Sequence, residues 1–223
     1  MRAFRYVLFL ALVTVSLILP PRSHADVVDL NPTDDAVIMM RSPDTNYGAS
    51  VEMVVENRYG HPAHPPNWEK DALSQFDLSS IPDHSVIILA RLHLYYYLWH
   101  DNDPVGRNLT CHSVTGSWIE ETVTWNSRPT WSSQVTSSAV VPNSFGWMDW
   151  DVTSDVQSVV NQELPNHGWV IMDEVPWNDF DIPWTQFYAK ENGFLVPYLE
   201  VIFAPPPTPV GVNSWGRIKE LFR

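Results

Sequence analysis

The sequence is poor in cysteine and in basic residues, and each shortage excludes a class of protein. Cys111 is the sole cysteine in 223 residues, which excludes an intrachain disulfide and a cysteine-rich zinc site. Lysine and arginine together number 13 against 26 acidic residues, so the net charge is -13. A chain this acidic is repelled by nucleic acid and by anionic lipid surfaces. We therefore expect no nucleic-acid partner.

The sequence also lacks recognisable catalytic motifs. It contains no GxSxG, P-loop or HExxH pattern. Carboxylate doublets such as Glu120-Glu121 and Asp173-Glu174 place neighbouring side chains on opposite faces of a strand. Such doublets do not make the facing acid–base pair that glycoside hydrolysis requires. We expect a protein that is not an enzyme; a small polysaccharide-active enzyme that uses Tyr and His side chains is a further alternative.

The one long apolar run lies at the N-terminus and predicts export. Arg2 and Arg5 precede this run, and Ser23-His24-Ala25 matches the small-residue pattern that signal peptidase cleaves. The run is shorter than the about 20 residues that a membrane span needs. We interpret residues 1–25 as a signal peptide. The sequence thus predicts a secreted protein, extracellular or at a cell surface, with no membrane span.

The remaining chain is rich in proline and in short extended segments. Nineteen prolines separate runs of β-branched and aromatic residues, a pattern typical of a β-sandwich. We predict an all-β antiparallel sandwich over residues 26–203, with one short helix at 154–162. A proline-rich linker follows at 204–211, and residues 212–223 form an amphipathic, locally basic tail. This tail resembles the C-terminal tails of secreted bacterial proteins, so we expect a sorting or docking partner for it.

Several phrases of the sequence, in a fixed order, resemble the DNRLRE-domain proteins, a family also described as carbohydrate-binding module family 96. These phrases are DAVIMMRSPDTNYGAS, ALSQFDLSSIPDHSVIILARLHLYYY, VTGSWIEETVTWNSRPTW, WMDWDVTSDVQSVVNQ, HGWVIMDE and FYAKENGFLVPYLEVIF. They cover roughly residues 27–203. The resemblance implies a jelly-roll-like β-sandwich, secretion, and non-catalytic attachment to polysaccharide or to a cell surface. A structural or adhesive surface module is the alternative.

The sequence departs from the family pattern in two inserts and in its charge. The inserts are RYGHPAHPPNWEK at 58–70 and EVPWNDFDIPW at 174–184. Some members of the family are associated with acidic polysaccharides such as alginate. The acidity of this chain argues against an alginate-like ligand here.

The tryptophans of GSWIEETVTWNSRPTW are predicted to be structural. In a strand expected over 121–125, Val123 and Trp125 share one face, so Trp125 is assigned to the core. Trp118 and Trp131 flank this strand, where large rings can close the end of a sandwich. The phrase is also typical of the family, which favours a role in the fold over a role in binding one ligand.

The strongest candidates for ligand binding lie in the long run ARLHLYYYLW. His93, Tyr95, Tyr97 and Trp99 alternate with residues that include Leu92, and they are expected to share the outward face of a strand. A flat aromatic surface with polar tips can pack against sugar rings. The other interpretation, equally open from the sequence, is that a loop covers these rings as a second layer of core.

Two loops supply further candidates. In the insert 174–184, Trp177 and Trp184 could hold a sugar edge-on, or they could pack as a lid on the sandwich. In SPDTNYG, Asp44 and Asn46 carry the oxygen ligands that a structural calcium ion prefers. An Asp-Asn turn without a metal is the alternative there.

Overall fold

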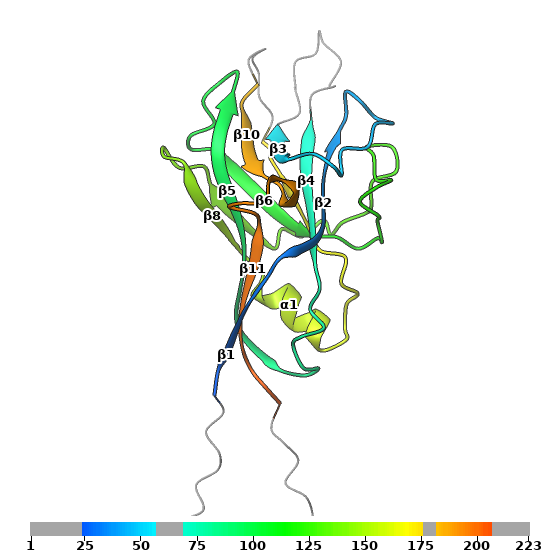
Figure 1. Cartoon of the computed structure of the whole chain (residues 1–223), viewed down its shortest axis with the longest axis vertical. Helices are drawn as coiled ribbons and strands as arrows, with labels where there is room; N and C mark the ends of the chain where they lie inside the picture. Colours follow the sequence, from blue (N-terminus) through cyan, green and yellow to red (C-terminus); the bar gives the residue numbers. More distant parts are fainter. Residues whose placement is uncertain (1–23, 57–68, 176–181, 207–223) are drawn as a thin grey trace, which may run out of the picture.

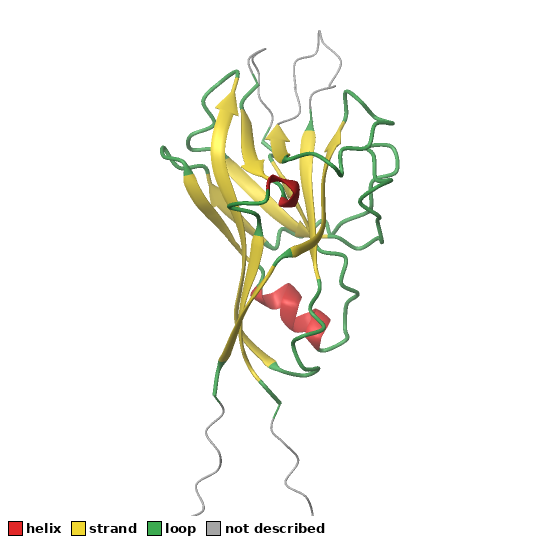
Figure 2. Ribbon diagram, in the orientation of Figure 1, coloured by secondary structure: helices red, strands yellow, loops and turns green. Residues whose placement is uncertain are grey.

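The computed structural model describes residues 24–56, 69–175 and 182–206. Its strands pair in antiparallel fashion throughout and form one curled sheet of 11 strands. The strand order is β1-β11-β5-β10-β3-β4-β9-β6-β7, with β2 paired to β4 and β8 paired to β5. The predicted all-β, jelly-roll-like antiparallel β-sandwich with one short helix is thereby confirmed (Figure 2).

The elements follow one another along the chain with short connections. They are β1 (Asp26–Leu30), β2 (Pro32–Met39), β3 (Glu52–Glu56), β4 (Lys70–Phe76), β5 (Val86–His100), β6 (Asn108–Ser113), β7 (Ser137–Val140), β8 (Gly146–Asp151), α1 (Thr153–Val160), β9 (Trp169–Met172), β10 (Trp184–Tyr188), the 3-10 turn η1 (Lys190–Asn192) and β11 (Tyr198–Ala204).

The curled sheet folds into two layers that meet at the junction of β3 and β4. Strands β1, β11, β5, β8, β10 and β3 make one layer, which we call the β5 layer. Strands β2, β4, β9, β6 and β7 make the other, the β4 layer. A single residue pair, Glu56 and Lys70, joins β3 to β4. Because each layer buries one face against the other, the two together enclose the main core.

Period-two alternation along the strands builds this main core. On β5, Leu92, Leu94 and Tyr96 are fully buried, and Met148 and Trp150 of β8 lie beside them on the same face. The Trp150 indole donates from Nε1 to the carbonyl of Leu109, at 3.0 Å, so the buried ring leaves no polar atom unpaired. The sequence predicted this inward set correctly.

A second core lies on the outer face of the β4 layer, beneath residues 115–131. Trp125 packs there with Val123, Val170 and Leu73, and it is only 7% exposed. We call residues 115–131 the tryptophan lid. The structural role predicted for Trp125 is confirmed, but the strand predicted over 121–125 is wrong. The lid makes local turn hydrogen bonds instead, such as that from the Val123 amide to the Ile119 carbonyl at 2.9 Å.

The helix α1 secures the start of β5. Its buried residues Val156 and Val160 face the main core. Gln157 accepts a hydrogen bond from the Ile87 amide at 2.8 Å and donates one to the Ser85 carbonyl at 3.0 Å. Within the described residues, no helix has both the length and the apolar character needed to cross a membrane.

The two ends of the described chain leave the molecule at one pole (Figure 1). Strand β1 pairs with β11 so that Asp26 lies opposite Phe203. Residues 1–23 of the predicted leader, most of the predicted linker, the predicted tail and Trp177 lie outside the described residues.

Candidate functional site

Aromatic side chains gather on the outer face of the β5 layer, and we call this set the aromatic face. Its members are His93, Tyr95 and Tyr97 of β5, Trp147 of β8, Tyr188 of β10 and Tyr198 of β11. Cross-strand pairing brings them together, because residues opposite each other in a sheet share a face. His93 lies opposite Tyr198 on one side, and Tyr95 lies opposite Trp147 on the other.

The rings of the aromatic face touch one another in two geometries. His93 stacks on Tyr198 with ring centroids 4.2 Å apart, and Tyr97 stacks on Tyr188 with centroids 4.0 Å apart. Trp147 stands edge-on to its neighbours, 5.2 Å from Tyr95 and 5.0 Å from Tyr198. The indole of Trp147 is 40% exposed, so it is the ring on this face most open to a ligand.

Trp99 does not belong to the aromatic face. Tyr96 pairs with Phe187, but Leu98 pairs with the adjacent Gln186, so β5 carries one extra residue, Tyr97, at a bulge. Beyond the bulge every side chain of β5 changes face. Trp99 consequently pairs with Thr185, which alternation places on the same side of β10 as the core residue Phe187. The predicted stripe therefore ends at Tyr97.

Trp184 lies on the same face of β10 as Tyr188, at the far end of the strand. Its ring centroid is 4.9 Å from that of His100, and Lys70 Nζ sits 3.4 Å from its centroid. The structure thus brings Trp184 to the face that carries Tyr95 and Tyr97. Whether these side chains bind a ligand stays a prediction.

Carboxylates border the aromatic face. His93 Nδ1 lies 2.6 Å from an oxygen of Asp149, and Nε2 of the same ring lies 3.8 Å from an oxygen of Glu200. Burial raises the pKa of Tyr198, and the negative charges of Asp29, Glu200 and Asp149 raise it further. Burial and the nearby Glu52 carboxylate likewise hold the pKa of Tyr97 well above its ordinary value. Both phenols therefore keep their protons.

Several polar atoms of this region are buried without a hydrogen-bond partner among the described residues. They are Nε2 of His93, the hydroxyl of Tyr97, Nε1 of Trp184 and Oε1 of Gln186. Buried polar atoms are nearly always paired in folded proteins, and an unpaired one needs a physical explanation, such as an ion or water that completes the bond. The aromatic face therefore holds unused donors and acceptors as well as rings.

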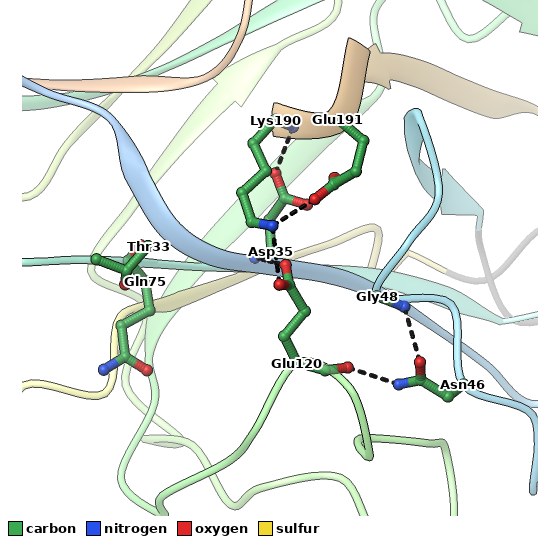
Figure 3. A network of polar contacts seen from close by, with 8 residues as sticks. All are labelled: Thr33, Asp35, Asn46, Gly48, Gln75, Glu120, Lys190 and Glu191. Carbon is green, nitrogen blue, oxygen red and sulfur yellow. Dashed lines mark hydrogen bonds and ion pairs between the residues drawn. The ribbon is translucent and has the colours of Figure 1, made fainter. Parts of the chain in front are cut away.

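A second polar constellation anchors the tryptophan lid (Figure 3). The Glu120 carboxylate of the lid accepts from the Asp35 amide at 2.8 Å and from Lys190 Nζ at 2.8 Å. Lys190 Nζ also donates to Glu191, and the Lys190 amide donates to the Asp35 carboxylate at 2.8 Å. We call these four residues the lid clamp. They join the lid to β2 and to η1.

The carboxylates of the lid clamp have the chemistry of a cation site. Oxygens of Asp35, Glu120 and Glu191 lie within 4.8 Å of one another. The Lys190 ammonium already supplies positive charge among them, and although burial lowers its pKa, its hydrogen bonds to Glu120 and Glu191 raise the pKa well above the ordinary value. Burial raises the pKa of Asp35 to about 7. The structure thus explains this cluster as an internal ion-pair network.

The predicted calcium ligands Asp44 and Asn46 lie beside the lid clamp, where they tie the SPDTNYG turn to the lid. Asn46 Nδ2 donates to the carbonyls of Glu120, at 2.6 Å, and Val123, at 2.8 Å. Asp44 accepts from the Asn126 amide at 2.8 Å. A role for Asp44 and Asn46 as metal ligands stays a prediction.

Sequence reasoning missed Trp147, Tyr188 and Tyr198 as members of one surface. Each stands on a different strand from β5, so no local pattern relates them. The nearest signal was the outward position of Trp147 in the alternating run FGWMDWDVT.

Comparison with known proteins gives one finding of family and one of absence. The family model described as carbohydrate-binding module family 96 matches residues 26–203. Among curated proteins, none matches the chain.

Proposed function

The chain belongs to carbohydrate-binding module family 96, and from this premise we propose that it is a secreted, non-catalytic module that attaches to polysaccharide or to a cell surface through its aromatic face. The single observation that carries the choice of site is the cluster of touching rings around the exposed Trp147. A role in binding rather than in catalysis follows from the family, whose members are modules for carbohydrate recognition.

The chemistry of the aromatic face suits a sugar chain. The C–H faces of pyranose rings pack on aromatic rings, and the polar edges of those rings supply hydrogen bonds to hydroxyls. Trp147 offers the exposed surface, and Tyr95 and Tyr198 support it edge-on. The unpaired Nε2 of His93 and hydroxyl of Tyr97 are further partners for sugar oxygens.

Replacement of Trp147 by alanine tests this function. We expect Trp147→Ala to weaken retention in affinity gels about tenfold, with an unchanged melting temperature, because an exposed ring contributes contact area to the ligand. The gels would contain the glycans that a glycan array identifies. Ile119→Ala, which removes an exposed apolar side chain from the tryptophan lid, is the matched control and should keep full retention.

A structural or adhesive module is the second candidate, and the stacking of rings on one another favours it. Tyr97 and Tyr188 use ring faces on each other, as do His93 and Tyr198. If the rings serve only the fold, Trp147→Ala leaves glycan retention unchanged while Tyr97→Ala lowers the melting temperature. That outcome would contradict the binding role of the aromatic face.

Export and the tail complete the proposal. The leader pattern of residues 1–25 supports secretion. In the tail, Trp215, Ile218 and Leu221 recur at helical spacing beside Arg217 and Lys219. This amphipathic, basic pattern supports a sorting or docking partner for residues 212–223.

A further inference from the structure

One end of the aromatic face is strongly acidic. Strands β1, β11, β5 and β8 lie side by side there, and their outward positions carry four carboxylates, those of Asp29, Asp149, Asp151 and Glu200. Arg91 of β5 is the basic residue in register with them, opposite Asp151 on one side and Glu200 on the other. The outward side chains of these strands therefore carry excess negative charge next to the exposed rings.

The carboxylates surround a buried histidine with an unused polar atom. The His93 side chain is 9% exposed, and its Nδ1 is taken up by Asp149 at 2.6 Å. Its Nε2 has no hydrogen-bond partner among the described residues, although a Glu200 oxygen lies 3.8 Å away. That separation is too long for a direct hydrogen bond. A donor group placed against the Glu200 oxygen would complete this arrangement.

The rings beside these carboxylates reinforce the preference for positive charge. Trp147 and Tyr198 border the Asp149–Glu200 pair, and an ammonium group is attracted both by carboxylates and by the faces of Trp and Tyr rings. A uronate or sulfate group at the same place would meet like charges. The chemistry of this end of the face thus separates glycans by their charge.

We propose that the aromatic face selects a polysaccharide with free amino groups, such as a chain of glucosamine units, and that an ammonium group of the sugar occupies the space between Asp149 and Glu200 beside His93. This inference rests on the proposed function, since it assumes that the aromatic face is the glycan site. It adds the charge of the ligand and the residues that read it.

The test compares three polymers with the purified full chain. A glucosamine polymer, its fully N-acetylated counterpart and a polyuronate are each cast into affinity gels, at a pH below the pKa of the sugar amine. We expect retention on the glucosamine polymer to be about tenfold tighter than on the N-acetylated polymer, and none on the polyuronate. The difference should shrink between about 0.1 M and about 1 M salt, as the Debye length falls from about 10 Å to about 3 Å.

Charge-neutral variants locate the selection. Asp149→Asn and Glu200→Gln should each narrow the ratio between the glucosamine and N-acetylated polymers, whereas Trp147→Ala should weaken retention on both. Glu121→Gln removes one negative charge from an exposed position of the tryptophan lid and should leave the ratio as it is. Melting temperatures of all variants show whether each fold is intact.

The outcomes separate this proposal from the function beneath it. Equal retention on both polymers, or retention on the polyuronate, overturns the selection for amino groups while Trp147-dependent binding leaves the glycan-binding function standing. Retention on polylysine as tight as on the glucosamine polymer also overturns it, because the surface would then bind any polycation. Loss of all glycan binding would remove both.

Discussion

Trp125 illustrates how a residue whose chemistry suggests ligand binding can act in the fold instead. Its ring fills the second core beneath the lid, with Val170 and Leu73 of the β4 layer below it. The Arg128 guanidinium lies 4.2 Å from the ring centroid and donates to the Trp125 carbonyl at 2.6 Å. The cationic group thus covers the edge of the core that the lid leaves exposed.

Truncation of Trp125 should therefore act on stability. We expect Trp125→Ala to lower the free energy of unfolding by about 3–5 kcal/mol, because it removes a large buried ring and leaves a cavity. Urea denaturation followed by circular dichroism measures the change. Ile119→Ala, at a position of the same lid that is 60% exposed, should stay within about 0.5 kcal/mol of the wild type. A Trp125→Ala protein with the wild-type midpoint would show that the second core does not support the fold.

Asp35 predicts a specific dependence of stability on pH. Burial raises its pKa in the folded protein to about 7 from an ordinary value of 3.8, so the folded state binds this proton more tightly than the unfolded state does. The contribution of Asp35 to the free energy of unfolding should consequently fall as pH rises from about 4 to about 7. Asp35→Asn can still accept from the Lys190 amide but cannot titrate, so its profile should be flatter over that range.

The control for Asp35 has the opposite sign. Hydrogen bonds from Ser79 lower the pKa of the exposed Asp77, so its contribution is lost as pH falls through that lowered pKa. Asp77→Asn should leave the profile between about pH 4 and pH 7 unchanged. Superimposable profiles for the wild type and Asp35→Asn would contradict the assignment.

At the scale of the element, β5 shows what sequence alternation can and cannot predict. The inward positions of Leu92 and Leu94 follow from the pattern itself, since the alternate residues are aromatic or charged. The bulge at Tyr97 depends on the pairing of β5 with β10, which begins more than 80 positions further along the chain. The pattern therefore predicted Tyr95 and Tyr97 on one face but also placed Trp99 there, and only the partner strand reveals the difference.

Other elements escaped prediction for equally physical reasons. Strands β1 (DVVDL) and β7 (SSAV) are short and largely solvent-exposed, so they lack the apolar alternation that marks a strand. Their backbones are ordered by pairing with β11 and β6, respectively. The reverse holds in the tryptophan lid, where Val123 and Trp125 alternate but no neighbouring strand pairs with them among the described residues.

The lid clamp makes a prediction about the lid as one element. Lys190→Met keeps much of the apolar stem but removes the ammonium that joins Glu120 to Glu191. We expect backbone amide hydrogen exchange in residues 116–124 to accelerate, because the lid loses a buried charged partner, while exchange in β5 stays slow. Mass spectrometry of exchanged peptides measures this.

Lys190→Arg provides the matched control for the lid clamp, since a guanidinium can donate to both carboxylates. Its exchange in residues 116–124 should stay closer to that of the wild type. Equal exchange rates in the wild type and Lys190→Met would mean that the second core alone holds the lid.

At the scale of the whole molecule, the two outer faces of the sandwich have different uses. The β4 layer is covered by the tryptophan lid, and the β5 layer carries the aromatic face. The sequence predicted the fold class and the two sets of aromatic residues, because each set lies within one contiguous phrase. It did not predict the lid clamp, whose members Asp35, Glu120 and Lys190 are brought together from positions 85 and 70 residues apart.

The pairing of β1 with β11 decides how the module would respond to mechanical force. Both flanks of the chain leave at the pole where Asp26 lies opposite Phe203, so tension between the flanks pulls across the strands rather than along them. The backbone hydrogen bonds of that pair would then open one after another, as in a zipper, instead of sharing the load. Because β1 is the outermost strand of its layer, it would peel away before either core is exposed. A module held by one flank alone bears no such load, and its opposite pole can follow a moving surface.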